Sequence, residues 1–276
     1  MTGYDLHTHS DRSDGTLRPS EVMRLAADRD LAGVALTDHD TFDGLEEASI
    51  SAEVLGLDFV PGIEFSAEHE GASLHVLGYW VSPDDPAIEQ ELLRLTATRM
   101  RRGELIVEKL RELGFDVSIE RVRELAGGGA IARPHIAQAL AEAGIVGSEE
   151  EAFERFIADD GLAYVPKHAM RPLDVLDLIG KAGGVCVLAH PGMWKATGSV
   201  PDALIEAMAA GGMAGIEVNH PDHDPEMRAK YRAIAERLDL VATSASDCHG
   251  ERYGYRLGAE RTDETTFAEL RRRAGR

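Results

Sequence analysis

The sequence predicts an α/β protein whose parallel strands form a barrel that carries a helical insertion. Three observations support this fold class. Short strand-like segments alternate with helix-length segments over most of the 276 residues, and a long, charged, helix-favouring stretch interrupts that alternation. A His, Asp or Glu residue lies at the end of nearly every predicted strand. Repeated β-then-α units are typical of a parallel sheet, and this many of them favour a barrel.

The first half of the barrel is expected to begin with the short strand Tyr4–Leu6. A helix follows from Pro19 to about Asp30, because proline is common in a first helical turn and the apolar residues after it recur at helical spacing. The strand Gly33–Leu36 is then followed by a helix from about Phe42 to Leu55. The remaining expected strands are Phe59–Ile63, Leu74–Trp80, Val185–Ala189, Gly215–Val218 and Val241–Thr243.

Residues 95–165 are predicted to form a helical insertion on a barrel made of residues 1–94 and 166–276. Insertions in such barrels enlarge the loops that border the active face, so a cap that grips the substrate is the expected role. A helical decoration without a role in binding is the alternative. The helices expected in the middle of the chain are Asp85–Leu113, Ile119–Leu125, Arg133–Ala143 and Glu149–Ile157.

Charge and composition argue against several classes of protein. The net charge of −20 disfavours a broad basic surface for duplex DNA, but it is compatible with a phosphorylated small molecule or a short single strand. The N-terminus lacks the pattern of a secretory signal, and no apolar run approaches the roughly 20 residues of a membrane span. We therefore expect a cytoplasmic protein with no membrane partner. The sequence leaves the oligomeric state open.

Metal-capable side chains follow the predicted strands. A His-x-His pair on extended backbone places both imidazoles on one side, so His7 and His9 can share one ion. Asp247 and His249 repeat that spacing, and the carboxyl ends of barrel strands converge on one face. The whole set is His7, His9, Asp14, Asp38, His39, Asp40, Glu64, His75, His190, Asp247 and His249.

A single histidine at a strand end is more often a structural residue than a ligand. Burying this many ionisable groups together without a metal would be costly, however. The sequence therefore predicts a site for two or three divalent ions. Imidazole and carboxylate ligands suit manganese, iron or zinc, and manganese is the metal we expect.

The segments DLHTHSDRSDG, TDHDTFDG, GIEFS, HVLGY, AHPG and SDCHG resemble, in this order, the signature segments of the polymerase and histidinol phosphatase (PHP) superfamily. The resemblance extends from the first residues to about Gly250 and implies a distorted barrel of about seven βα units. RPHIA, which begins at Arg133, and the overall length more narrowly resemble bacterial PHP phosphoesterases that act on nucleoside 3′,5′-bisphosphates and on the 5′ ends of short RNAs.

The resemblance also implies three metal positions. The first ion would be held by His7, His9, Glu64 and Asp247. The second would share Glu64 and add His75 and His190. The third would take Asp14, His39 and His249. The residues expected to carry the reaction are His7, His9, Glu64, His190 and Asp247. The general acid is left open among the neighbourhood of His190, Asp38 and His220.

Contacts to the substrate are expected from basic and polar residues outside the metal centre, because a guanidinium suits phosphate oxygens. The candidates are Arg133, His135, Lys167, His168, Arg171 and Asn219. Pro134 and Pro172 equally suit helix starts, which would make their neighbours capping residues instead.

The leading hypothesis is a metal-dependent phosphomonoesterase that converts nucleoside 3′,5′-bisphosphates to nucleoside 5′-monophosphates, with the trimming of short RNA from its 5′ end as a second activity. The insertion and RPHIA favour a nucleotide, because a base and ribose need a large enclosed pocket. A histidinol-phosphate phosphatase is the nearest alternative. A metal-binding PHP module without hydrolytic activity is the second.

Overall fold

The computed structural model describes residues 2–127, 131–158, 161–165, 169–194 and 198–276. Contacts along the chain divide it into two compact units. The first unit is Met1–Glu89 together with Ala169–Arg276, and the second is Gln90–His168. Helix α3 (Pro86–Glu112) begins in the first unit and continues into the second.

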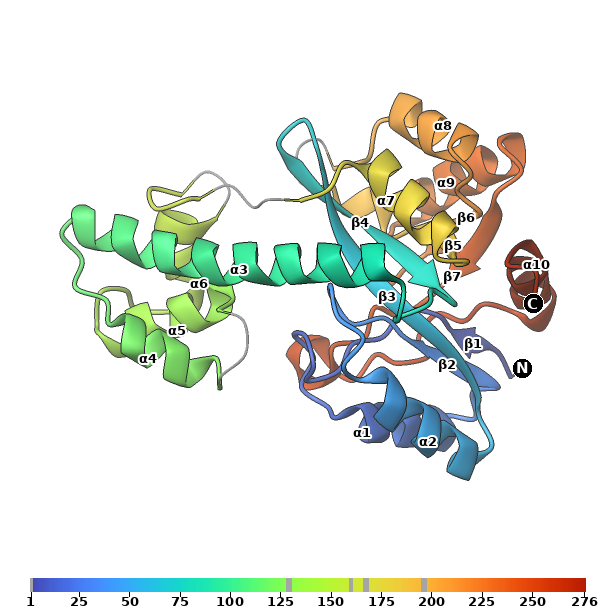
Figure 1. The fold of residues 1–276 in the computed structure, drawn as a ribbon, viewed down its shortest axis with the longest axis horizontal. Helices are drawn as coiled ribbons and strands as arrows, with labels where there is room; N and C mark the ends of the chain where they lie inside the picture. The colour runs from blue at the N-terminus through green and yellow to red at the C-terminus, as the bar shows by residue number, and fades with distance from the viewer. Residues whose placement is uncertain (1, 128–130, 159–160, 166–168, 195–197) are drawn as a thin grey trace. The chain divides into compact units, whose positions relative to one another are not determined.

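The first unit contains one seven-stranded sheet whose strands are hydrogen-bonded in sequence order (Figure 1). The strands are β1 (Tyr4–Asp5), β2 (Gly33–Leu36), β3 (Asp58–His69), β4 (Ala72–Tyr79), β5 (Val185–Leu188), β6 (Gly215–Asn219) and β7 (Val241–Ser244). A parallel bridge joins Thr8, after β1, to Cys248, after β7, and the N–H of His9 donates to the carbonyl of Cys248 at 2.9 Å. The sheet is therefore nearly closed, which confirms the predicted distorted barrel of seven strands.

The expectation of parallel strands throughout is wrong at β4, which is antiparallel to both β3 and β5. Strand β3 does not end at Ile63 but continues to His69 and turns back through Glu70 and Gly71. Both turn residues have positive φ angles, 51° and 80°, as in the two-residue turns that match the twist of a hairpin. Glu64 therefore lies within a strand rather than at the end of one.

Helices cover the outside of the barrel. Figure 1 shows α1 and α2 side by side, and α1 packs Val22 and Met23 into the core beneath β2. Phe42 to Gly44 form a turn, so α2 begins three residues later than expected. The helices of this unit are α1 (Pro19–Asp28), α2 (Leu45–Leu55), α7 (Pro172–Lys181), α8 (Asp202–Ala210), α9 (Pro225–Arg237) and α10 (Glu264–Arg273).

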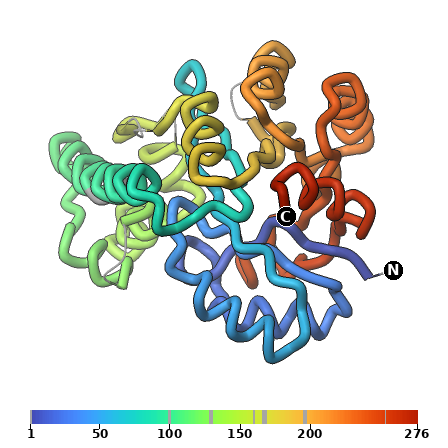
Figure 2. Tube along the Cα trace, turned by 45° about the vertical axis from the view of Figure 1, so that its right-hand side comes forward, coloured from blue at the N-terminus to red at the C-terminus, as the bar shows by residue number. Residues whose placement is uncertain are grey.

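The N-terminal strand and the C-terminal segment lie side by side on this unit (Figure 2). Tyr4 in β1 forms an antiparallel bridge with Thr262, and its ring stacks on Phe267 of α10 with the centroids 3.8 Å apart. The buried hydroxyl of Tyr79 donates to the carbonyl of Leu6 at 2.7 Å, which ties β4 to the segment that leads from β1 to His7.

The second unit is helical and has its own apolar core, in which Leu110, Val122, Ile136, Leu140 and Phe156 are fully buried. Besides α3 it contains α4 (Ile119–Leu125), α5 (Arg133–Glu142), α6 (Glu149–Ala152) and a π-helical turn at Phe153–Ile157. Within the described residues, no helix has both the length and the apolar character needed to cross a membrane.

Candidate metal centre

The barrel brings all nine predicted metal ligands together in four overlapping groups. Within each group, one possible ligand atom per residue lies within 4.8 Å of the others. The groups are His9, Asp14, His39 and His249; His7, Glu64 and His190; His7, His9 and Asp247; and His39, Glu64 and His75. The assignment of particular residues to particular ions stays a prediction.

Glu64 lies at the centre of these groups and is almost completely buried. Its Oε2 atom is 3.2 Å from Nε2 of His7, 3.2 Å from Nε2 of His9 and 3.0 Å from Nδ1 of His39. Its Oε1 atom is 2.9 Å from Nδ1 of His75 and 3.1 Å from Nε2 of His190. One carboxylate therefore faces five imidazoles, as a bridging ligand would.

Two further carboxylates complete the centre on either side. Oδ1 of Asp247 is 3.4 Å from Nε2 of His7 and 3.2 Å from Nε2 of His9. Oδ1 of Asp14 is 3.2 Å from Nε2 of His249, and it is 3.9 Å from Nε2 of His39. Asp247 thus presents one oxygen to two imidazoles that follow β1, and Asp14 presents one oxygen to imidazoles that follow β7 and β2.

The carboxylates and imidazoles shift one another's pKa values strongly in the metal-free protein. Burial alone would lower the pKa of His9, but Asp247 and Glu64 outweigh it and raise the pKa to about 10. Burial would raise the pKa of Glu64, but the facing histidines, His39 foremost, hold it well below its usual range. In the metal-free protein, protonated histidines and ionised carboxylates therefore stabilise one another at this site.

Several buried polar atoms of the centre have no hydrogen-bond partner in the described part of the chain. They are Nε2 of His7, both ring nitrogens of His9, Nδ1 of His39, Oδ1 of Asp14, Oε2 of Glu64 and Oδ1 of Asp247. Buried polar atoms without partners are rare because they are costly. Divalent ions would satisfy these atoms, so the residues fit a centre of several ions.

Two of the ligands lie on strained backbone. His190 has a φ of 23° and Asp247 a φ of 49°, in the region that residues other than glycine usually avoid. The N–H of His190 donates to Oε2 of Glu217 at 2.7 Å, and Arg256 donates to the carbonyl of Asp247 at 3.1 Å. Strain that neighbouring contacts maintain is typical of functional sites.

Three residues around the centre were not predicted from the sequence. Glu217 is fully buried in β6 with its Oε1 3.0 Å from Nδ1 of His7. A glutamate inside the apolar strand GIEVN was an available signal, since glutamate is rarely buried without a partner. Arg256 lies 3.5 Å from Oδ2 of Asp247, and Arg252 lies 3.6 Å from Oδ2 of Asp14.

Asp38 and Asp40, which also follow β2, are buried and hold loops rather than join the ligand groups. The carboxylate of Asp38 accepts hydrogen bonds from the N–H and hydroxyl of Ser10 at 2.7 and 2.6 Å and from the hydroxyl of Ser13 at 2.6 Å. Asp40 accepts from the N–H and hydroxyl of Ser66. Asp38 thereby fixes the loop that leads to Asp14.

Four of the predicted substrate contacts make local interactions within their own unit. In the second unit, Arg133 donates to the carbonyl of Ile157 at 3.2 Å, and Nδ1 of His135 accepts the N–H of Ala132. In the first unit, Arg171 is exposed and paired with Asp174, and Asn219 donates to Ser244. Lys167 and His168 lie outside the described residues. The substrate roles of all six stay predictions.

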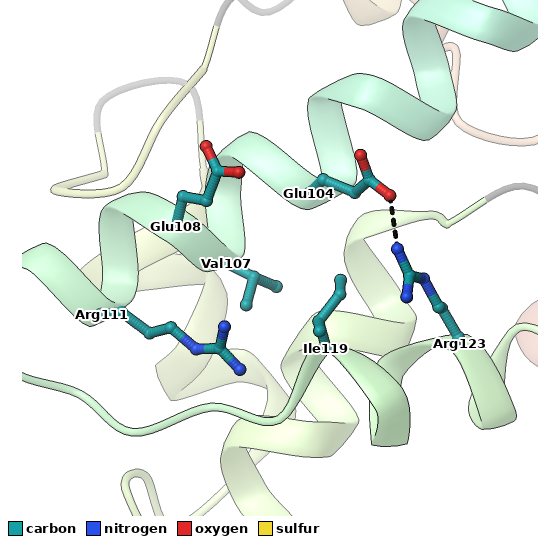
Figure 3. A pocket seen from close by; sticks show the side chains of 6 residues that line it. All are labelled: Glu104, Val107, Glu108, Arg111, Ile119 and Arg123. Atoms are coloured by element: carbon teal, nitrogen blue, oxygen red, sulfur yellow. Dashed lines mark hydrogen bonds and ion pairs between the residues drawn. The ribbon is translucent and has the colours of Figure 1, made fainter.

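A surface pocket of about 180 Å³ lies in the second unit (Figure 3). Its two glutamates and two arginines compensate one another, and Arg123 pairs with Glu104 at 2.7 Å. The pocket is lined by Glu104, Val107, Glu108, Arg111, Ile119 and Arg123. It contains none of the ligand groups, so the metal chemistry belongs to the barrel.

The barrel is nearly closed, and buried imidazoles and carboxylates gather where its strands converge. This fold and site place the protein in the class of metal-dependent hydrolases. A model of the PHP domain matches residues 5–153. The chain is 32% identical over 89% of its length to the 5′-3′ exoribonuclease Rnm of Escherichia coli, of which it covers 85%. It is 33% identical over 93% of its length to the 3′,5′-nucleoside bisphosphate phosphatase of Chromobacterium violaceum, of which it covers 90%.

Solved structures agree with this relationship. The chain matches a Bifidobacterium adolescentis protein assigned as a metal-dependent phosphoesterase with a TM-score of 0.89 and 34% identity, covering 99% of this chain and 96% of that one. The chain therefore belongs to the PHP domain family and is a metal-dependent phosphoesterase.

Proposed function

We propose that this phosphoesterase hydrolyses nucleoside 3′,5′-bisphosphates to nucleoside 5′-monophosphates and accepts short single-stranded RNA at its 5′ end as a second substrate. The proposal that the protein hydrolyses a phosphate ester rests on one observation: the buried carboxylate of Glu64 faces five imidazoles. The nucleotide part is supported by the activities of the two relatives, a bisphosphate phosphatase and an exoribonuclease.

The ligand residues would hold two or three divalent ions, and we propose Mn²⁺ as the native metal with Zn²⁺ or Fe²⁺ as alternatives. Divalent ions held here would lower the pKa of water and neutralise phosphoryl oxygens. The protein's own residues fix that chemistry in space. Glu64 would bridge two ions, His7, His9 and Asp247 would hold one of them, and His190 would share another with Glu64.

We infer that Asp38 is not the general acid, because three hydrogen bonds from Ser10 and Ser13 hold its carboxylate in the loop. Burial raises its pKa in spite of these hydrogen bonds, so the inference rests on the position of the carboxylate. The protein thus uses this carboxylate to hold the loop before Asp14 in place rather than to deliver a proton.

The substrate can be identified by giving the Mn²⁺-loaded protein three substrates in parallel assays: adenosine 3′,5′-bisphosphate, histidinol phosphate and a short 5′-phosphorylated RNA. We expect the bisphosphate to have the highest kcat/KM and the RNA to be shortened from its 5′ end. Faster turnover of histidinol phosphate would contradict the nucleotide assignment. Absence of activity on every phosphate ester, in a protein that binds metal, would identify the non-catalytic module instead.

The predicted contact from Arg133 has a matched control in Arg155. Both arginines belong to the second unit and lie over a phenylalanine ring, Arg133 over Phe153 at 5.9 Å and Arg155 over Phe156 at 4.8 Å. We expect Arg133→Met to raise KM for the bisphosphate roughly 10- to 100-fold, the loss of one hydrogen bond to a charged group. Arg155→Met should leave KM unchanged. Equal KM values in both variants would remove Arg133 from the substrate site.

A further inference from the structure

The end of β6 carries two fully buried ionisable residues, Glu217 and His220, that belong to none of the four ligand groups. Unlike Asp38 and Asp40, they do not hold the loops that follow β1 and β2. Both side chains nevertheless face predicted ligands at 3.0 to 3.4 Å. Their role follows from the atoms that they contact.

Glu217 contacts two ligands from two different strands. Its Oε1 is 3.0 Å from Nδ1 of His7, and its Oε2 accepts the backbone N–H of His190 at 2.7 Å. Because the carboxylate can only accept, Nδ1 of His7 carries the proton, and its Nε2 lone pair faces Glu64 and Asp247. The other oxygen holds His190 in its strained backbone conformation.

His220 faces the outer oxygen of Asp247. Nδ1 of His220 accepts the backbone N–H of Asp222 at 3.1 Å, so in the neutral ring the proton is on Nε2. That Nε2 lies 3.4 Å from Oδ2 of Asp247, while Oδ1 of the same carboxylate faces His7 and His9. The described residues give Nε2 of His220 no hydrogen-bond partner of good geometry, and Oδ2 of Asp247 at 3.4 Å is an acceptor within its reach, while Oδ1 is left for a metal.

We propose that the end of β6 is a positioning segment for the metal centre: Glu217 orients the ring of His7 and the backbone of His190, and His220 orients Asp247. This inference rests on the metal centre of the proposed function. One segment that supplies no ligand thereby aligns ligands that follow β1, β5 and β7. Partners of this kind set the tautomer and direction of a metal-bound side chain, and their loss costs about 10- to 100-fold in metal affinity.

Two variants of His220 distinguish the effect of the N–H donor at Nε2 from the effect of replacing the imidazole ring. His220→Gln places an amide N–H near the position of Nε2 and keeps the donor to Asp247. His220→Asn places its amide near Nδ1, keeps the acceptor for the N–H of Asp222 and loses the donor. The readout is Mn²⁺ affinity, measured by competition with a chromophoric chelator and by the metal content of the purified protein.

We expect His220→Asn to bind Mn²⁺ at least about 10-fold more weakly than the wild type and His220→Gln to stay within about threefold. Equal affinities in the two variants, whether both are high or both are low, overturn the assignment of His220. This measurement needs no substrate. A protein that binds metal but does not hydrolyse nucleoside bisphosphates would therefore refute the proposed function and leave this result standing.

Glu217→Gln provides the second test, and Val218→Ala is its matched control. The amide of the glutamine could accept through one oxygen only, so either His7 or the N–H of His190 loses its acceptor, and we expect Mn²⁺ affinity to fall about 10- to 100-fold. Val218 is fully buried next to Glu217 in the same strand and has no ionisable side chain, so its truncation should lower the thermal stability and leave Mn²⁺ affinity unchanged. A Glu217→Gln protein with wild-type affinity would refute the proposal.

Discussion

Removal of the metal should make the barrel less stable as the pH rises from 6.5. In the metal-free protein, the pKa of His9 is raised from 6.5 to about 10 by Asp247 and Glu64, against the opposing influence of burial. A raised pKa contributes stability that is complete below 6.5 and is lost as the pH increases towards 10. The pKa of His7 is raised well above its usual value and acts in the same direction.

The size of the loss follows from proton linkage. The free energy of unfolding falls by about 1.4 kcal/mol for each unit of pH increase over which the histidine is neutral in the unfolded protein and protonated in the folded protein. Between pH 6.5 and about 8.5, His9 alone accounts for about 2 kcal/mol, which corresponds to roughly 4–8 °C in Tm for a domain of this size. The pKa of His39 is lowered to about 3, chiefly by burial, so His39 affects stability only below pH 6.5.

Tryptophan fluorescence measures this effect on the barrel alone, because Trp80 and Trp194 both belong to the first unit and the second has none. Thermal unfolding would be followed in EDTA-treated protein from pH 6.5 to about 8.5, with the Mn²⁺-loaded protein as the control. The metal-free Tm should fall across this range, and it should fall less in His9→Asn. A metal-free Tm that is constant or rises with pH would show that these charge interactions are absent.

Three further substitutions have definite expected outcomes. Glu64→Gln should abolish phosphoesterase activity and reduce the bound metal by more than one ion, because one carboxylate faces five imidazoles; metal analysis showing full occupancy would contradict this. Tyr79→Phe should lower the unfolding free energy by about 1–3 kcal/mol through the unsatisfied carbonyl of Leu6 while metal affinity is retained, as measured by denaturant unfolding and chelator competition. Gly192→Ala should weaken metal binding, since a Cβ would lie 2.8 Å from the ring of His223 beside the His190 loop; unchanged affinity would show that the loop adapts.

The side chains that gather in the barrel could be predicted from the sequence because their signal is local and repeated. His7 and His9 are two residues apart after a strand, and Asp247 and His249 repeat the pattern, so alternation and barrel convergence together place all four. Strand β4 was predicted, but its antiparallel direction was missed because a continuous β-then-α rhythm was assumed across it. The turn residues Glu70 and Gly71 show that a hairpin was encoded there, since both have positive φ angles.

The positioning residues are harder to recognise from sequence for a physical reason. Glu217 acts through contacts to His7 and His190, which are 210 and 27 residues away along the chain. No spacing rule connects such positions, and only the order of strands in the barrel brings them together.

Arg133 shows the converse case. Its motif was conspicuous, yet its described contacts are with its own helical unit.

The charge of the centre explains how so acidic a protein can bind a phosphate ester without a basic surface. Three carboxylates, Asp14, Glu64 and Asp247, contribute three negative charges to the ligand set, and two divalent ions would already exceed them by one positive charge. A third ion would add two more, and the buried Glu217 would remove one. Counted with Glu217, the site would be neutral with two ions and locally cationic with three, on a chain with a net charge of −20. Attraction of the phosphoryl group should then depend on bound metal more than on any single arginine, so loss of Glu64 should reduce activity far more than loss of Arg133.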